Sequence, residues 1–367
     1  MNLTWRGPLL AVAGGAALIL GAACGSDSET TTATPSTGSP AASAATAAPT
    51  EDPKAGWPEE IRLGFFGGDD AEEVLERVEP MRVYLEETLG RPVTIFTGTS
   101  YGAVIEAMRA KRVEGMLVGP FAYVLAVQEA GAEALAVSIS CSSSEDPCKV
   151  VENRQPHYFS VVMAKKGSGI ESIDDLRGKD FAFVDPASTS GHLAPKTLII
   201  KNGVDPDVDM KTVFAGSHPT AVLALENDNV VAAATHENNL LNLIKEGQVN
   251  GCFYADGIAN RGTPRTPEEI KQTADACEDG KIVIIAQSDP IPNTPFAVRS
   301  DLPDTLKQAM KDALLAIKDD PEAVALDRRW FVDPTEQLGL QSLDQYYNSL
   351  RDIAKLLDLD LKELAES

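Results

Sequence analysis

Short apolar runs typical of strands alternate with amphipathic segments typical of helices along most of this chain. In the first helical segment, apolar residues recur at helical spacing until Gly90, which is a typical helix stop. Strands are predicted at 61–66, 93–96 and 116–118, and helices at 71–89, at 101–111 and from Phe121. Strands that alternate with helices favour a largely parallel α/β sheet with helices on both faces.

The alternation resumes after residue 156 and indicates a second α/β unit. The later elements are strands at 159–163, 181–184, 213–214, 231–234 and 282–285, with helices from about Ser190, from Pro219, and at 304–317, 321–330 and 343–357. Two extended segments, near 157–161 and 286–298, connect the units. The pattern permits a hinged pair of lobes with a cleft between them: lobe 1 at 57–155 plus 287–367, and lobe 2 at 156–286.

The first 23 residues have the pattern of a secretory signal. Arg6 is the only charged side chain before Asp27, and an apolar run at 9–20 leads to Gly21-Ala22-Ala23 and then Cys24. The run is shorter than the roughly 20 apolar residues of a spanning helix. Small residues before a cysteine resemble a bacterial lipobox, in which Cys24 becomes the lipidated first residue. The alternative is an ordinary cleaved signal with an unrelated cysteine nearby.

Residues 24–56 are predicted to form a flexible tether behind the lipidated cysteine. The segment is rich in Thr, Ser, Ala and Pro and has no periodic apolar residues. Such a stretch buries too little apolar surface to offset its conformational entropy. A tether of this length would hold the folded part on the order of 30 Å from the membrane.

The charge of the chain is strongly negative. It has 32 Lys and Arg against 55 Asp and Glu, a formal net charge of −23. Nucleic acid is therefore excluded as a partner, because phosphate contacts need clustered basic residues. The acidity serves solubility, and any anion site must be built locally against the global field. We expect the protein to be a monomer.

Four cysteines besides Cys24 suggest two disulfides in an exported chain. The pairings Cys141–Cys148 and Cys252–Cys277 are favoured because each closes a short loop rich in Gly, Ser or Asp. Zinc is the alternative, but it needs paired cysteines at closer spacing or nearby histidines. No metal site and no cofactor is predicted.

The strongest local signal is Asp185-Pro-Ala-Ser-Thr-Ser-Gly-His192, between a predicted strand and a predicted helix. The first N–H groups of a helix have no internal partner, and the macrodipole is positive there. Ser188, Thr189 and Ser190 can donate hydroxyl hydrogens to the same point, and Gly191 permits a close approach of the backbone. This combination predicts an anion site. A simple Ser or Thr helix cap is the alternative, but it explains one hydroxyl rather than three.

Nucleophilic or metal catalysis has little support in the sequence. Ser190 lies near His192, but no Gly-x-Ser-x-Gly motif is present and nothing marks a third triad member. The four histidines show no tight metal-binding spacing. His218 begins a predicted helix in Gly216-Ser-His-Pro-Thr220, where an oxyanion contact and a helix cap are equally compatible with the pattern.

The chain also resembles the phosphonate-, phosphite- and phosphate-binding proteins of ABC transporters, often called the PhnD-like family. The resemblance extends over about residues 60–320, and its most specific parts are the complete Asp-Pro-x-Ser-Thr-Ser-Gly signature and the Ile-Pro segment. The matching elements are Pro80–Val93, Tyr101 with Val104–Met108, Gly119–Tyr123, Asp185–Gly191, Gly216–His218 and Ser288–Pro295.

The resemblance implies a two-lobed type II periplasmic-binding-protein fold with the ligand between the lobes. It implies that the Ser188–Ser190 hydroxyls and amides hold the phosphorus oxygens, helped by His218. Tyr101 and Tyr123 would supply aromatic walls or hydroxyl contacts, although core packing is an alternative for Tyr123. Glu237 would hold an ammonium group at the far end of the ligand, or be a surface carboxylate.

The favoured function is therefore an extracytoplasmic lipoprotein that captures a phosphonate, phosphite or related phosphorus oxyanion for an ABC permease and its ATPase. Binding of another oxyanion such as a sulfonate, and a ligand-sensing role beside a membrane receptor, are the alternatives. A cell-surface enzyme acting on phosphorylated small molecules would need a general base or metal, which the sequence does not mark.

Overall fold

The computed structural model describes residues 52–66, 68, 71–140, 156–254, 262–324 and 329–359. The predicted signal segment, the predicted lipidation site Cys24, most of the predicted tether and the predicted Cys141–Cys148 pair lie outside these residues. Within them, no helix is both long and apolar enough to cross a bilayer.

The first sheet has six strands in the order β13-β4-β12-β3-β1-β2. Strands β1, β2 and β3 pair in parallel, whereas β12 and β13 pair antiparallel with their neighbours. The strands are β1 (Ile61–Phe66), β2 (Val93–Thr97), β3 (Gly115–Val118), β4 (Ala132–Ser140), β12 (Pro295–Arg299) and β13 (Arg329–Val332).

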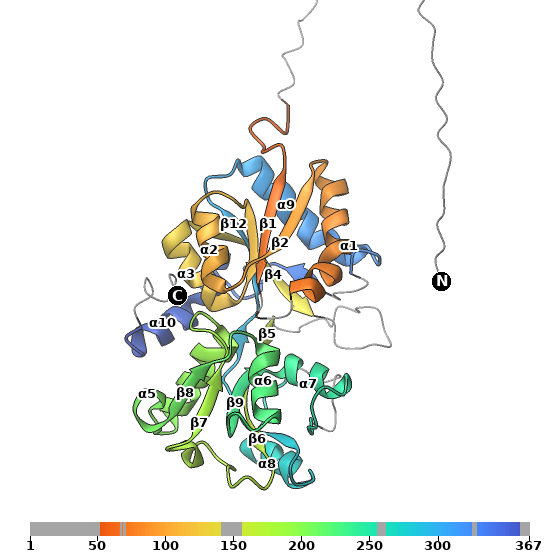
Figure 1. The fold of residues 1–367 in the computed structure, drawn as a ribbon. Helices are drawn as coiled ribbons and strands as arrows, with labels where there is room; N and C mark the ends of the chain where they lie inside the picture. Colours follow the sequence, from red (N-terminus) through yellow and green to blue (C-terminus); the bar gives the residue numbers. More distant parts are fainter. Residues whose placement is uncertain are drawn as a thin grey trace, which may run out of the picture. The chain divides into compact units, whose positions relative to one another are not determined.

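Helices cover both faces of this sheet because its strands are apolar on both sides. In β3, Leu117 belongs to the core under α1 and α9, while Met116 and Val118 belong to the core under α2 and α3. Figure 1 shows these two helix pairs on opposite sides of the strands. The helical elements of this lobe are α1 (Ala71–Leu89), α2 (Tyr101–Arg109), α3 (Pro120–Ala130), α9 (Asp304–Ala316), η4 (Ile317–Asp319), η5 (Leu343–Tyr347) and α10 (Asn348–Leu356).

The second sheet has five strands in the order β10-β6-β9-β7-β8. They are β6 (Ser160–Lys165), β7 (Asp180–Phe183), β8 (Lys211–Phe214), β9 (Ala232–His236) and β10 (Ile282–Gln287). Helices α6 and α7 cover one apolar face and α4 the other. The helical elements are η1 (Asp174–Leu176), η2 (Thr189–Leu193), α4 (Ala194–Lys201), α5 (Pro206–Asp209), α6 (His218–Glu226), α7 (Glu237–Lys245) and α8 (Pro267–Asp275).

Two short strands join the lobes where the sequence predicted crossings. β5 (His157–Tyr158) pairs antiparallel with β11 (Ile291–Pro292). The chain thus enters the second lobe beside the strand by which it returns. The residues of the first sheet lie before β5 and after β11, and those of the second sheet lie between these two strands. This division is close to the expected lobe boundaries, whose exact positions remain a prediction.

Two expectations about the elements were wrong. The sheets are mixed rather than largely parallel, because the chain passes between lobes through strands, and the strands next to these crossings pair antiparallel. The predicted helix at 321–330 was also wrong where the structure describes it, since residues 321–324 form turns and Arg329–Val332 forms strand β13 against β4. Trp330 and Phe331 are 4% and 1% exposed, and burial in the sheet overrides the local helical pattern.

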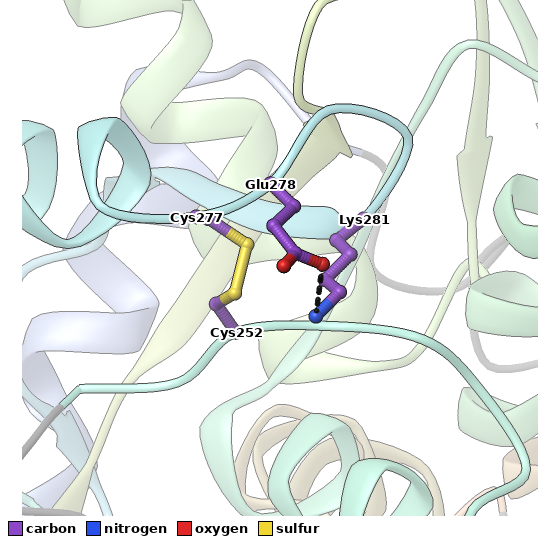
Figure 2. Close-up of a disulfide and its surroundings, with 4 residues drawn as sticks. All are labelled: Cys252, Cys277, Glu278 and Lys281. Atoms are coloured by element: carbon purple, nitrogen blue, oxygen red, sulfur yellow. Dashed lines mark ion pairs between the residues drawn. A yellow bond between two sulfur atoms is a disulfide. The ribbon is translucent and has the colours of Figure 1, made fainter.

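The predicted Cys252–Cys277 disulfide is present, with Cα atoms 6.1 Å apart (Figure 2). It ties the segment after α7 to the residues that follow α8. A salt bridge between Glu278 and Lys281, 2.9 Å long, lies next to it.

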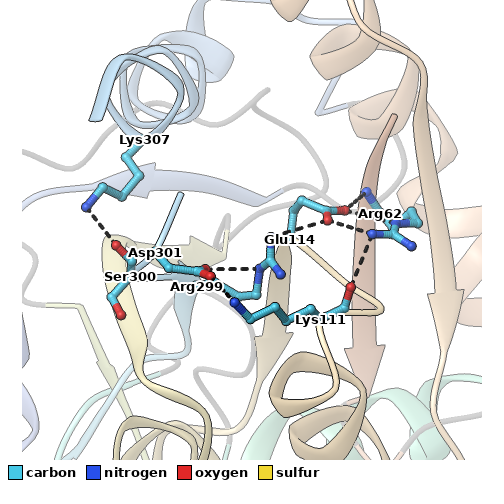
Figure 3. A network of polar contacts seen from close by, with 7 residues as sticks. All are labelled: Arg62, Lys111, Glu114, Arg299, Ser300, Asp301 and Lys307. Atoms are coloured by element: carbon cyan, nitrogen blue, oxygen red, sulfur yellow. Dashed lines mark hydrogen bonds and ion pairs between the residues drawn. The ribbon is translucent and has the colours of Figure 1, made fainter. Parts of the chain in front are cut away.

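A buried carboxylate anchors the amino-terminal ends of β1 and β3 in the first sheet. Glu114 is 1% exposed. It accepts hydrogen bonds from Arg62 at Nη2 (2.7 Å), at Nε (3.1 Å) and at the backbone N–H (2.8 Å). The Arg299 guanidinium lies 3.7 Å away and continues the network towards Asp301 (Figure 3).

Replacement of Glu114 by alanine should lower the free energy of unfolding by about 3 kcal/mol, because it leaves the Arg62 backbone N–H and the largely buried Arg299 guanidinium without their buried anion. Chemical denaturation measures this loss. Glu79→Ala, which removes an exposed partner of Arg82, is the matched control and should cost less than about 1 kcal/mol. Equal losses in the two variants would contradict a structural role for the buried network.

Candidate ligand-binding site

A cavity of about 160 Å³ lies where the two lobes and the hinge meet. It is lined by described residues of both sheets, of β5 and of the segment after β11. They are Phe65, Phe66, Val74, Arg77, Val78, Tyr101, Leu117, Val118, Gly119, Ser138, Tyr158, Thr189, Ser190, His218, His236, Asn238, Asn293, Thr294 and Arg329.

Five helical N-termini begin at residues of this lining. They are those of α2 at Tyr101, α3 after Gly119, η2 at Thr189, α6 at His218 and α7 after His236. Each follows a strand of the parallel part of its sheet. Unpaired backbone N–H groups and the positive ends of the macrodipoles therefore point to one region. This local field suits an anion even in a chain with a net charge of −23.

The Ser-Thr-Ser-Gly motif divides its roles between structure and cavity. Ser188 Oγ accepts the Gly191 N–H at 3.0 Å, so Ser188 is the helix cap and does not line the cavity. A Cβ at Gly191 would lie 2.3 Å from the Val184 Cβ, which explains why this position needs glycine. Thr189 and Ser190 line the cavity. Capping therefore accounts for only one of the three hydroxyls.

Two hydrogen bonds join the lobes beside the cavity. Thr189 Oγ1 accepts the Phe121 N–H at the start of α3, at 2.8 Å. The His218 N–H donates to the Gly68 carbonyl at 2.7 Å. Because the Thr189 oxygen is engaged as an acceptor from the first lobe, its own hydrogen is left for an acceptor elsewhere.

Tyr158 enters the site from the hinge strand β5 and was missed by the sequence analysis. Its hydroxyl interacts with the Ser190 and Thr189 hydroxyls, which lower its pKa, but the larger effect of burial raises the pKa to about 12. The phenol is therefore neutral at physiological pH and can donate a hydrogen bond. A strand of two residues has too little alternation of apolar and polar side chains to predict which of them faces the cavity.

Two histidines, His218 and His236, pack edge-to-face at the cavity, with ring centroids 4.5 Å apart. His236 Nδ1 accepts the Asn239 N–H at 3.1 Å, which places the ring hydrogen on Nε2. His218 Nδ1 lies 2.9 Å from Thr235 Oγ1. Burial, and then the neighbouring His236, hold the His218 pKa well below its ordinary value. A neutral imidazole is also what a helix N-terminus favours.

Of the two expected tyrosines, only Tyr101 lines the cavity. It is 2% exposed and packs edge-on against Phe66, with centroids 4.8 Å apart. Tyr123 lies in the first-lobe core, where its hydroxyl donates to Asp344 Oδ1 at 2.8 Å and its ring packs on Tyr347. Tyr123 lies on the side of α3 that packs against η5. It therefore has the core-packing role that was the alternative to a ligand contact.

Glu237 is displaced from the cavity by one residue. It is 2% exposed, and its carboxylate accepts the Gly262 N–H at 2.6 Å. Its neighbours His236 and Asn238 line the cavity. The Asn238 Oδ1 atom is buried and has no hydrogen-bond partner among the described residues. The turn that the sequence marked borders the cavity, but the start of α7 places Asn238 rather than Glu237 in the lining.

Two cationic residues in the lining were not predicted. Arg77 comes from α1, where it lies 3.5 Å from Glu73, and Arg329 begins β13. Arg77 follows Val74 by three residues on the inward face of its helix, and this spacing is a signal that could have been used. Arg329 fell within a segment whose secondary structure was predicted wrongly.

The family described as "ABC transporter, phosphonate, periplasmic substrate-binding protein" has a model that matches residues 63–338. The chain belongs to this family. The resemblance drawn from the motifs is thereby confirmed.

Curated relatives of this family are recognisable at moderate identity. The "Phosphate-import protein PhnD" of Mycolicibacterium smegmatis is 29% identical over 218 residues, which cover 56% of this chain and 65% of that protein. The "Phosphonates-binding periplasmic protein" of Escherichia coli is 26% identical over 274 residues, covering 73% of this chain and 69% of that protein. The matches thus span about two thirds of these relatives.

Solved structures support the fold. A binding component of an ABC phosphonate transporter from Pseudomonas aeruginosa has a TM-score of 0.57 at 23% identity, covering 84% of this chain and 96% of that one. PhnD1 from Prochlorococcus marinus, in complex with methylphosphonate, has a TM-score of 0.59 at 15% identity, covering 84% and 99%. The chain has the two-lobed type II periplasmic-binding-protein fold.

His192, the residue that follows the Asp185–Gly191 signature, should give the protein a measurable pH dependence. Burial lowers its pKa to about 4, so below pH 6.5 the unfolded chain binds a proton that the folded chain does not. Stability is full above pH 6.5 and falls as the pH drops towards 4. From pH 7 to pH 5, His192 should remove about 2 kcal/mol. Urea denaturation of wild type and His192→Gln at both pH values measures this, and identical pH slopes would contradict it.

Proposed function

We propose that the protein is the extracytoplasmic component that captures a small phosphorus oxyanion for an ABC importer. The observation that carries this proposal is the convergence of five helical N-termini and the Thr189, Ser190 and Tyr158 hydroxyls on one small cavity. Membership of the family supports it. Phosphonate, phosphite and phosphate share the tetrahedral oxygens that such donors suit.

The phosphorus oxygens would be held from both lobes and from the hinge. Thr189 and Ser190 would donate their hydroxyl hydrogens and backbone amides from the second lobe, together with the His218 ring. Tyr101 would form a wall on the first lobe. Charge-assisted hydrogen bonds of this kind are about twice as strong as neutral ones. Ligand contacts from both lobes would stabilise the closed arrangement over an open one.

The closed form would then dock on a permease with its ATPase. We further propose that Cys24 carries a lipid and that residues 24–56 tether the monomeric binding unit to the membrane. Binding without catalysis is part of the proposal. The cavity presents hydrogen-bond donors, and the Nδ1 atoms of both lining histidines already have partners.

Asn238 would set the preference at the far end of the ligand in place of Glu237. Its buried Oδ1 needs a donor, and a ligand hydroxyl, a protonated phosphorus oxygen or an amine would supply one. A neutral amide accepts such a donor without adding negative charge to an anion site. The side chain therefore tolerates small oxyanions that a carboxylate would repel.

Calorimetric titration of the purified protein should show tight binding of at least one of phosphite, methylphosphonate, phosphate and 2-aminoethylphosphonate. The Thr189→Ala/Ser190→Ala variant should bind that ligand at least about tenfold more weakly, because two charge-assisted hydrogen bonds are lost. Thr197→Ala is the control, since its buried hydroxyl donates to the Leu193 carbonyl within the same lobe and outside the cavity. Wild-type affinity in the double variant would place the site elsewhere. Binding of sulfate or taurine alone would favour a sulfur oxyanion instead.

Asn238→Asp should weaken phosphite and methylphosphonate about tenfold or more and shift preference towards 2-aminoethylphosphonate, whose ammonium group a carboxylate attracts. The same titrations measure this shift. Asn242→Asp adds an equal charge on the exposed side of α7 and should change neither affinity. Parallel losses for all ligands in both variants would mean that only net charge matters.

A further inference from the structure

The hinge between the lobes is a very short structure. β5 and β11 pair over only two residues each, and the Asn293 N–H adds a hydrogen bond to the Pro156 carbonyl at 2.8 Å. Ladders this short have little stability of their own. Other contacts must therefore hold the hinge strands in place.

Two consecutive tyrosines of η5 supply such contacts, one to each side of the hinge. The Tyr346 hydroxyl donates to the Pro156 carbonyl, immediately before β5, at 2.6 Å. The Tyr347 hydroxyl donates to the Asn293 carbonyl, immediately after β11, at 3.0 Å. These carbonyls flank the strand pair at the same end, where His157 pairs with Pro292.

The segment that carries the tyrosines is fixed to the first lobe. Tyr347 is fully buried, and Leu343 and Leu350 belong to the same core as α3. Asp344 accepts hydrogen bonds from Tyr123 at 2.8 Å and from Arg351 at 2.6 Å. The two hydroxyls are thus held in a defined position relative to the first sheet.

Residues of the hinge segment contact the residues that line the cavity. Tyr158 in β5 lies two residues after Pro156, and its hydroxyl forms hydrogen bonds with the Thr189 and Ser190 hydroxyls. Two residues further on, Ser160 Oγ donates to the Ser190 carbonyl at 2.6 Å. The hinge segment therefore carries one cavity side chain and contacts the first turn of η2, which carries two more.

We propose that Tyr346 and Tyr347 are positioning residues for ligand capture, whose hydroxyls hold the hinge in the conformation that places Tyr158 against Thr189 and Ser190. Neither tyrosine lines the cavity, so both act through the hinge. Burial raises the pKa of both phenols, which stay neutral donors at physiological pH. The proposal rests on the proposed function for its ligand, but its hinge part can be tested without one.

The test compares wild type with Tyr346→Phe, Tyr347→Phe and the double variant. Tyr84→Phe is the matched control, because its hydroxyl also donates to a backbone carbonyl, that of Ala313, at 3.0 Å within the first lobe and away from the hinge. Hydrogen exchange of the Asn293 amide reports on the hinge in the absence of ligand. Titration and stopped-flow dissociation with the phosphorus ligand report on capture.

Each single variant should exchange the Asn293 amide faster and weaken the ligand about fivefold, mainly through faster dissociation, and the double variant about twentyfold. Tyr84→Phe should lower the melting temperature comparably and leave exchange and affinity unchanged. Wild-type exchange and affinity in the double variant would overturn the proposal, as would equal affinity losses in the double variant and in Tyr84→Phe. If wild type bound none of the phosphorus compounds, the proposed function would fail. Exchange of the Asn293 amide would then decide the hinge role alone, with an unchanged rate overturning it.

Discussion

The direction of the parallel strands in each sheet determines where this protein can hold an anion. β2 and β3 in one lobe, and β7, β8 and β9 in the other, each lead into a helical element at their carboxyl ends. Since parallel strands end at the same edge of a sheet, these N-termini are brought together. The converging N-termini add positive potential to that of Arg77 and Arg329 in the lining, within a chain whose net charge is −23.

At these N-termini, side chains that cap the helix lie close in sequence to side chains that line the cavity. Ser188 satisfies one N–H of the signature turn, and the His236 ring satisfies one at the start of α7. Ser190 and Asn238, two residues further along the chain, line the cavity, as the His236 ring also does. The cap fixes the backbone conformation of the turn, and this conformation sets the direction of the neighbouring side chains. This division explains why adjacent residues in one motif have different roles.

Sequence reasoning located the turns of the site more accurately than their individual side chains. The hydroxyl cluster and His218 could be named because each lies at a strand-to-helix boundary visible in the local pattern, whereas Tyr101 was named from the resemblance to the PhnD-like family. Glu237 and Asn238 differ by one position, which on a helix is a rotation of about 100°. Tyr158 could not be named, since a two-residue strand carries no usable periodicity. Its role depends on a partner strand more than 130 residues away.

The sequence by itself determined the α/β class, the two units, their crossings, one disulfide and the strand-to-helix turn that borders the cavity, because each of these follows from local spacing and composition. Tertiary structure decided the mixed strand directions, the strand at Arg329–Val332 and the inward placement of Arg77 and Tyr158. It also moved Tyr123 into the core beside Tyr347. The physical reason is that burial and strand pairing depend on segments distant in the chain, and no local pattern records which of them will meet.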